Sequence, residues 1–164
     1  MKLRPTIKSS AILLLSAGLL WGNVFADTTT TTTTSTAASS SNSFLDKNKT
    51  RPGVITTADG LQYKVIKPGT GNSPTDADTV TVNYEGRLVN GTVFDSSYKR
   101  GQPASFPVNG VIAGWTEALK LMKVGSTYEL FIPAELAYGS EGAPPAIGPN
   151  ETLIFKVELL GIQK

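Results

Sequence analysis

The chain has 164 residues with 15 basic and 13 acidic side chains, and it contains neither cysteine nor histidine. Without these two residue types it cannot build a Ser-His-Asp relay, an imidazole or thiolate metal site, or a disulfide framework. Its length suits one folded domain with a buried core.

Residues 1–26 have the three-part layout of a secretory signal peptide. Lys2, Arg4 and Lys8 precede the apolar run AILLLSAGLLW, and small residues stand at the cleavage positions that end in Ala26. The competing interpretation, a membrane anchor, needs about 20 apolar residues, more than this run provides. We therefore expect an exported protein, either periplasmic, secreted or held at the outer surface of the cell.

Cleavage after Ala26 changes the charge balance. It removes three of the 15 basic residues, which leaves 12 against 13 acidic ones. A nearly neutral protein has no electrostatic footprint for nucleic acid or for an anionic membrane.

Residues 27–51 are expected to form a disordered tail and linker. The tract TTTTTTTSTAASSSNS has almost no apolar surface to offset the entropy of ordering, and FLDKNKTRPG continues it. A glycosylated or recognition stalk is the alternative. Ordered structure is expected to begin near Val54, within a domain assigned to residues 52–164.

Alternation of apolar and polar residues predicts strands over residues 61–67, 79–89, 126–133 and 152–162. Turn residues such as Asn90-Gly91 separate these segments, which favours an antiparallel sheet. Within 114–125 the period changes to that of a helix, and a glycine stands at each end as a start and a stop. Four apolar residues share one helical face there: Trp115, Ala118, Leu119 and Met122.

These elements predict an α+β fold in which a curved antiparallel sheet, a half-barrel, wraps around one short helix. Two short motifs do not reach a ligand-binding pattern. Gly69-Thr70-Gly71 lacks the spacing and the lysine of a phosphate loop, and Asp76-Ala77-Asp78 lacks the later ligands of a calcium loop. We therefore expect no metal and no cofactor.

The stretch GTVFDSSYKRG, residues 91–101, places Asp95 directly after Phe94 at a strand end. Taken alone, Asp95 is interpreted as a loop cap or as an ion-pair partner of Arg100, and each aromatic residue as core. Composition and spacing by themselves indicate an exported α+β domain with an apolar cleft. The candidate residues for that cleft are Tyr84, Phe94, Asp95, Phe106, Val111, Ile112, Trp115, Tyr138, Ile147 and Phe155.

The order of several motifs resembles that of the FKBP-type peptidyl-prolyl cis/trans isomerases. VTVNYEGRLVNGTVFDSS, VIAGWTEAL and AYGSEGAPPAIGPNETLIFKVELL follow one another between about residue 52 and the C-terminus. The likeness is closest to the catalytic domain of the bacterial macrophage infectivity potentiators. It implies a curved sheet around a short helix, proline-containing polypeptides as substrates, and macrolide ligands of the rapamycin class.

The resemblance also implies a role for each residue. Asp95, Tyr84 and Tyr138 are the expected catalytic residues, with Asp95 at the rim beside Tyr84. The Ile112 N–H and the Tyr138 hydroxyl would donate hydrogen bonds to the bound peptide. Trp115 would be the floor of the proline pocket, and the other substrate-binding residues would be Phe94, Phe106, Val111, Ile112, Ile147 from the 138–150 flap, and Phe155.

The chain departs from the family pattern at three points. Ala104 stands where many members have a second pocket aromatic, and Ala143 occupies a flap position that is often larger. The long helical dimerisation module of the infectivity potentiators has no counterpart in residues 27–50, so we expect a monomer. Two alternatives to an enzyme stay open: a non-catalytic module that grips proline-containing segments, and a surface adhesin with a Thr/Ser stalk.

Overall fold

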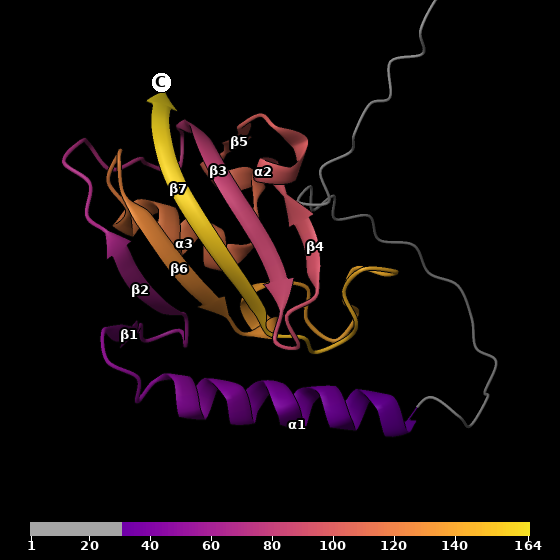
Figure 1. Cartoon of the computed structure of the whole chain (residues 1–164). Helices are drawn as coiled ribbons and strands as arrows, with labels where there is room; N and C mark the ends of the chain where they lie inside the picture. Colours follow the sequence, from indigo (N-terminus) through magenta and orange to yellow (C-terminus); the bar gives the residue numbers. More distant parts are fainter. Residues whose placement is uncertain (1–30) are drawn as a thin grey trace, which may run out of the picture.

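The structure, a computed structural model, describes residues 31–164, with side chains from residue 38 onward. The predicted signal peptide lies outside the described residues. Within residues 31–164, seven strands form one open antiparallel sheet in the order β1-β2-β6-β7-β3-β4, with β5 paired to β3 (Figure 1). The strands are β1 (Val54–Thr56), β2 (Gln62–Lys67), β3 (Thr79–Leu88), β4 (Val93–Ser96), β5 (Ala104–Pro107), β6 (Thr127–Ile132) and β7 (Leu153–Gln163).

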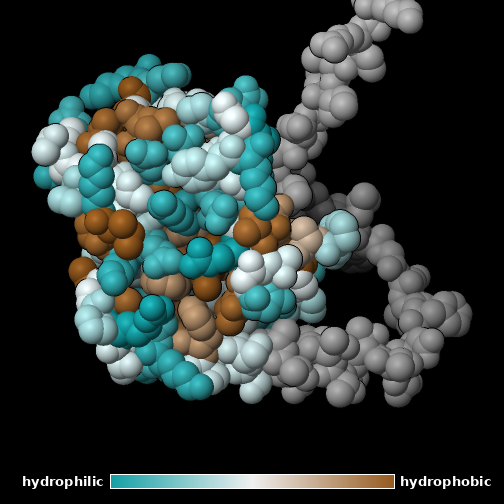
Figure 2. Space-filling view, in the orientation of Figure 1, coloured by the Kyte–Doolittle hydropathy of each residue, from teal (hydrophilic) through white to brown (hydrophobic). Residues whose placement is uncertain are grey.

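β3 and β7 form the centre of the sheet, where they pair from Thr79 opposite Gln163 to Leu88 opposite Leu153. The residues of β3 alternate strictly between buried and half-buried, so that Val80, Val82 and Tyr84 face the core. This is the period of two that the sequence predicts, and the four long strands lie within one residue of their expected bounds. The outer face mixes hydrophilic and hydrophobic residues in small patches (Figure 2).

α3 (Ala113–Leu121) packs behind the sheet and buries Trp115, Ala118, Leu119 and Met122, as predicted (Figure 1). The α+β class is thereby confirmed. The expected helix ends were wrong, because the helix stops at Leu121 and Gly125, with φ of +89°, belongs to the turn before β6. Gly114 lies inside the helix, where a Cβ would stand 2.5 Å from Ile132 Cγ2, so the glycine allows close packing on β6.

Two expectations were wrong. A helix, α1 (Thr31–Asn48), lies within residues 27–51, where a disordered segment was expected, and α3 is therefore not the only helix. α1 crosses one end of the sheet (Figure 1). Its Phe44 ring lies 6.0 Å from the Phe131 ring of β6, and the side chains of Ser41 and Asn48 are buried. With Leu45 these residues have the spacing of one helical face, and polar members anchor that face by hydrogen bonds.

The remaining helices are short: α2 (Ser97–Arg100) and the 3-10 turns Val108–Gly110 and Ala134–Leu136. α2 follows β4 and lies beside β3, next to the candidate site. No helix among the described residues is long and apolar enough to cross a membrane.

Candidate active site

Five aromatic side chains from five different elements meet between the sheet and α3. Around Trp115 of α3, the Tyr84 and Phe155 rings lie at 5.3 Å and the Phe106 ring at 5.9 Å, each nearly perpendicular to the indole. Phe94 joins this aromatic cluster through Phe155, at 5.5 Å. Edge-to-face contacts of this kind add to the free energy gained by burial alone. The structure therefore brings together the aromatic residues that the sequence singles out.

The base of the aromatic cluster is dry. Trp115, Tyr84 and Phe155 have no exposed surface, and Phe94 at the edge is half-buried. The indole Nε1–H of Trp115 is buried without a hydrogen-bond partner among the described residues. Since most buried donors in native proteins are paired, this donor marks a place where stability is not optimised.

Gly86 of β3 makes room for two members of the aromatic cluster. It pairs with Asp95 of β4 on one side and with Phe155 of β7 on the other. A Cβ at this position would lie 2.6 Å from Phe155 Cε1 and 2.7 Å from Phe94 Cζ. A side chain there would push the rings apart, so only glycine fits. Sequence reasoning missed this residue, although a glycine inside an alternating strand signals a close approach.

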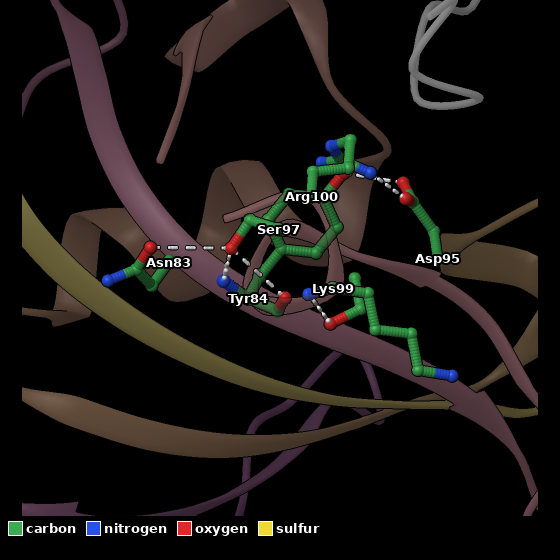
Figure 3. A network of polar contacts seen from close by, with 7 residues as sticks. Asn83, Tyr84, Asp95, Ser97, Lys99 and Arg100 are labelled. Carbon is green, nitrogen blue, oxygen red and sulfur yellow. Dashed lines mark hydrogen bonds and ion pairs between the residues drawn. The ribbon is translucent and has the colours of Figure 1, made fainter. Parts of the chain in front are cut away.

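Asp95 is held from two sides at the rim of the aromatic cluster (Figure 3). Its Oδ2 accepts a hydrogen bond from the Tyr84 hydroxyl at 2.5 Å, and its Oδ1 forms an ion pair with Arg100 Nη1. Arg100 Nη2 also donates to the Tyr84 hydroxyl at 2.9 Å, and the guanidinium lies 5.4 Å from the Tyr84 ring centroid. Asp95 thus has both neighbours that the sequence analysis named, and its side chain is only 8% exposed.

Local sequence explains how Arg100 reaches this position. The Ser96 hydroxyl caps α2 by accepting from the Lys99 N–H at 3.3 Å, and Gly101 ends the helix in the left-handed conformation. The fully buried Ser97 hydroxyl accepts from the Tyr84 N–H at 2.8 Å (Figure 3). α2 is therefore attached to β3 at Tyr84 itself. Sequence reasoning missed Ser97, because a serine pair after a strand indicates only a cap.

Burial and charge keep the phenols of the site protonated. Burial, and then the hydrogen bond to Asp95, raise the pKa of Tyr84 well above its ordinary value. Burial and the negative charge of Asp95 raise the pKa of Tyr138 as well. Burial acts to lower the pKa of Arg100, but its bonds to Tyr84 and Asp95 outweigh this and raise it. Both hydroxyls are hydrogen-bond donors at neutral pH.

Val111 and Ile112 lead into α3 at the N-terminal side of Trp115. The Ile112 carbonyl accepts from the N–H groups of Trp115 and Thr116 at 2.9 and 3.1 Å, which makes Ile112 the N-cap of α3. Its own N–H makes no hydrogen bond to another described residue. The first N–H groups of a helix have no acceptor within the helix, so the Ile112 N–H is available to a ligand. Both side chains are buried in the core that contains the aromatic cluster.

Residues 138–150 form a loop, here called the flap, that carries Tyr138 and Ile147. Two hydrogen bonds join Ala143 and Ile147 across the flap, at 2.9 and 3.0 Å. At its base the Asn150 N–H donates to the Gly139 carbonyl at 2.8 Å. Ile147 is buried and Tyr138 half-buried, and both pack with the core.

The two small residues that depart from the family pattern, Ala104 of β5 and Ala143 of the flap, are partly buried and pack against the same core.

The described residues contain no group of three or more acidic side chains placed to hold a metal ion. The groups that the described residues bring to the site are aromatic rings, the phenols of Tyr84 and Tyr138, the Ile112 N–H and the Asp95–Arg100 pair.

Comparison with known proteins identifies two family models along the chain. Residues 71–160 match "FKBP-type peptidyl-prolyl cis-trans isomerase", and residues 24–65 match "Domain amino terminal to FKBP-type peptidyl-prolyl isomerase". The second match contains α1, so the segment that was expected to be disordered belongs to a known N-terminal domain type.

Individual relatives agree with these matches. The chain is 64% identical to the peptidyl-prolyl cis-trans isomerase Mip of Coxiella burnetii and 56% identical to the outer membrane protein MIP of Legionella longbeachae, over 74% and 75% of its length. It covers 53% of each, so it spans about half the length of these curated relatives. A solved peptidyl-prolyl cis-trans isomerase from Pseudomonas syringae pv. tomato matches with a TM-score of 0.75 and 38% identity, over 85% of this chain and 100% of that one.

Proposed function

Because the chain belongs to the family of FKBP-type peptidyl-prolyl cis-trans isomerases, we propose that it accelerates rotation about X–Pro bonds in proline-containing polypeptides. One observation carries the proposal: a dry aromatic cluster lies beside a carboxylate whose two oxygens are both engaged, in a chain without histidine or cysteine. Such a site lacks a free proton carrier, and the rotation of an X–Pro bond requires none.

The reaction is slow because of amide resonance. Resonance imposes a barrier of about 18–20 kcal/mol, and the uncatalysed exchange takes tens to hundreds of seconds. The twisted transition state loses resonance, so its carbonyl is less polar than that of the planar amide. Water around the carbonyl favours the planar form, and a dry aromatic surface favours the twisted one. This preference for the transition state lowers the barrier, by tenfold in rate for each ~1.4 kcal/mol.

The described residues divide this task between them. The proline ring packs against the aromatic cluster, with Trp115 at its base and Val111, Ile112 and Phe106 around it. The Ile112 N–H and the Tyr138 hydroxyl donate hydrogen bonds to the peptide and hold it in register. Two features support these roles: the Ile112 N–H has no other hydrogen-bond acceptor among the described residues, and the Tyr138 hydroxyl remains protonated at neutral pH.

Asp95 acts by its charge and position rather than by moving a proton. Its ion pair with Arg100 and its hydrogen bond from Tyr84 engage both of its oxygens and hold its orientation. In this proposal the negative charge of Asp95 faces the carbonyl carbon of the rotating bond. Asp95 also orients Tyr84 through the hydrogen bond between them. Tyr84 in turn contributes its ring to the wall of the site.

We further propose that the substrates are exported proteins. Residues 1–26 have the pattern of a signal peptide, and one relative is named an outer membrane protein. Cell fractionation with an antibody against the folded domain tests this location. Recovery in the cytoplasm would contradict it, and recovery in the periplasm, medium or outer membrane would support it.

A proline-turnover assay tests the function itself. In a protease-coupled assay with an X–Pro peptide, the chain should raise the rate of cis-to-trans conversion in proportion to its concentration. A macrolide ligand of the rapamycin class, which would occupy the same aromatic surface, should abolish that increase. Binding of the peptide without turnover would instead favour a non-catalytic module that grips prolyl segments.

A further inference from the structure

Backbone hydrogen bonds within the flap and at its base hold its conformation. Within the flap, Ala143 and Ile147 bond to each other. Where it rejoins the sheet, Asn150 has φ of 57° in the left-handed region and donates its N–H to the Gly139 carbonyl at 2.8 Å. Gly139 directly follows Tyr138, so the conformation of Asn150 bears on the position of the Tyr138 hydroxyl.

A residue of α1 holds this point from outside the sheet. The Ser41 hydroxyl donates to the Asn150 carbonyl and accepts from the Thr152 N–H, both at 3.0 Å. Ser41 is 3% exposed, and its partners lie 109 and 111 residues further along the chain. The two hydrogen bonds lie on either side of Glu151, so the Ser41 hydroxyl holds both the end of the flap and the residue before β7.

From this geometry, and resting on the isomerase function proposed above, we propose that Ser41 is a positioning residue for the reaction. It holds Asn150 so that the Asn150–Gly139 bond forms and the Tyr138 hydroxyl points at the bound peptide. α1 is then a functional part of the site rather than a tether. Removal of the Ser41 hydroxyl takes this partner away from the Asn150 carbonyl and the Thr152 N–H. The resulting cost in free energy falls on the end of the flap.

The other end of α1 provides a matched comparison. Asn48 is 1% exposed and donates to Gln62 Oε1 at 2.9 Å, while Gln62 Nε2 donates to the Leu45 carbonyl at 3.0 Å. This network attaches the same helix to β2, away from the flap. Loss of Asn48 weakens the docking of α1 without removing a bond to Asn150.

The experiment compares Ser41→Ala, Asn48→Ala and Ser43→Ala, in which Ser43 is an exposed serine of the same helix. Ser41→Ala should lower kcat/KM for an X–Pro peptide about fivefold. Ser43→Ala should leave it unchanged, and Asn48→Ala should lower Tm but not kcat/KM. Equal kcat/KM losses in Ser41→Ala and Asn48→Ala would overturn the proposal, because α1 would then act through general stability.

Hydrogen exchange supplies a measurement that needs no activity. In Ser41→Ala the amides of Ala143, Ile147 and Asn150 should exchange about tenfold faster, while those of the β3–β7 ladder stay unchanged. If the wild-type chain proves inactive, the proposed function fails, and these amides still decide whether Ser41 holds the flap. Should Ser41→Ala not fold, the same amides in the wild type must open together with those of residues 41–48 at low denaturant. Independent opening of the flap would contradict the proposal.

Discussion

The carboxylate of Asp95 is engaged on both oxygens, and this decides what its substitution should do. Asp95→Asn keeps the size of the side chain but removes the charge that faces Arg100. Because the charge acts electrostatically and no proton is transferred, we expect kcat/KM to fall about tenfold and not to zero.

The protease-coupled assay measures this loss. Asp76→Asn is a suitable control, since Asp76 also forms an ion pair, with Lys120 at 3.1 Å, but its side chain is 63% exposed. The control should keep full activity. A complete loss of turnover in Asp95→Asn would show that Asp95 is an obligate proton carrier.

The two phenols of the site predict how activity and stability depend on pH. The pKa values of Tyr84 and Tyr138 are both raised from the ordinary value of 10.0, so neither titrates near neutrality. We expect kcat/KM to stay flat from about pH 6 to about pH 9. A pronounced bell between pH 6 and 8 would contradict the mechanism.

The free energy of unfolding should depend on the ionisation of Tyr84 at high pH. A raised pKa in the folded state means that folding favours the protonated hydroxyl of Tyr84. Its contribution is therefore fully present below the unfolded pKa of about 10 and is lost as pH rises toward the folded value. Thermal unfolding should show Tm falling above about pH 10, and Tyr84→Phe should reduce that fall.

At the scale of elements, the sequence predicts those whose stability comes from one regular apolar face. The four long strands alternate with a period of two, and α3 buries one stripe, so both could be predicted. β1, β4 and β5 have only three or four residues each, too few for the alternation to be seen.

α1 could not be predicted from apolar spacing because half of its buried face is polar. Ser41 is buried through hydrogen bonds to Asn150 and Thr152, which lie 109 and 111 residues further along the chain, and Asn48 through a hydrogen bond to Gln62. Composition alone therefore indicated disorder. The catalytic roles of Tyr84, Asp95 and Tyr138 were assigned by resemblance to a family, since their spacing in sequence does not by itself bring them together.

Substitution of Gly86 in β3 tests how the sheet supports the aromatic cluster. Gly86→Ala places a methyl group against Phe94 and Phe155, so we expect the free energy of unfolding to fall by about 1–3 kcal/mol. kcat/KM should fall as well, because both rings must shift. Denaturant unfolding and the proline-turnover assay measure the two effects.

Gly161→Ala is the matched control for this change. Gly161 lies in the neighbouring strand β7, and a Cβ there would meet no atom within 4 Å. The control should keep both stability and activity. Equal effects of the two substitutions would show that the space at Gly86 has no special role.

For the whole molecule, the question is whether a second copy is needed. The inner face of α1 packs Phe44 against Phe131 of its own sheet and buries Ser41 and Asn48 there. The outward side chains of its described part are polar and exposed, among them Asn42, Ser43, Asp46 and Lys47. A stable interface between two proteins buries at least about 1,000 Å² with an apolar centre, and the described outward side chains of α1 do not form such a centre.

We therefore expect residues 27–164 to be monomeric in solution. This expectation rests on the polar outer face of α1 and no longer on a missing N-terminal module, since residues 24–65 match a domain amino terminal to the isomerase. Sedimentation equilibrium over a range from micromolar to near-millimolar protein should give one mass that does not change with concentration. Phe44→Ala should lower the free energy of unfolding by about 1–3 kcal/mol, because its half-buried ring packs on Phe131, and leave that mass unchanged. A dimer that Phe44→Ala dissociates would show that α1 docks on a second copy, and that the contact between Phe44 and Phe131 joins two chains.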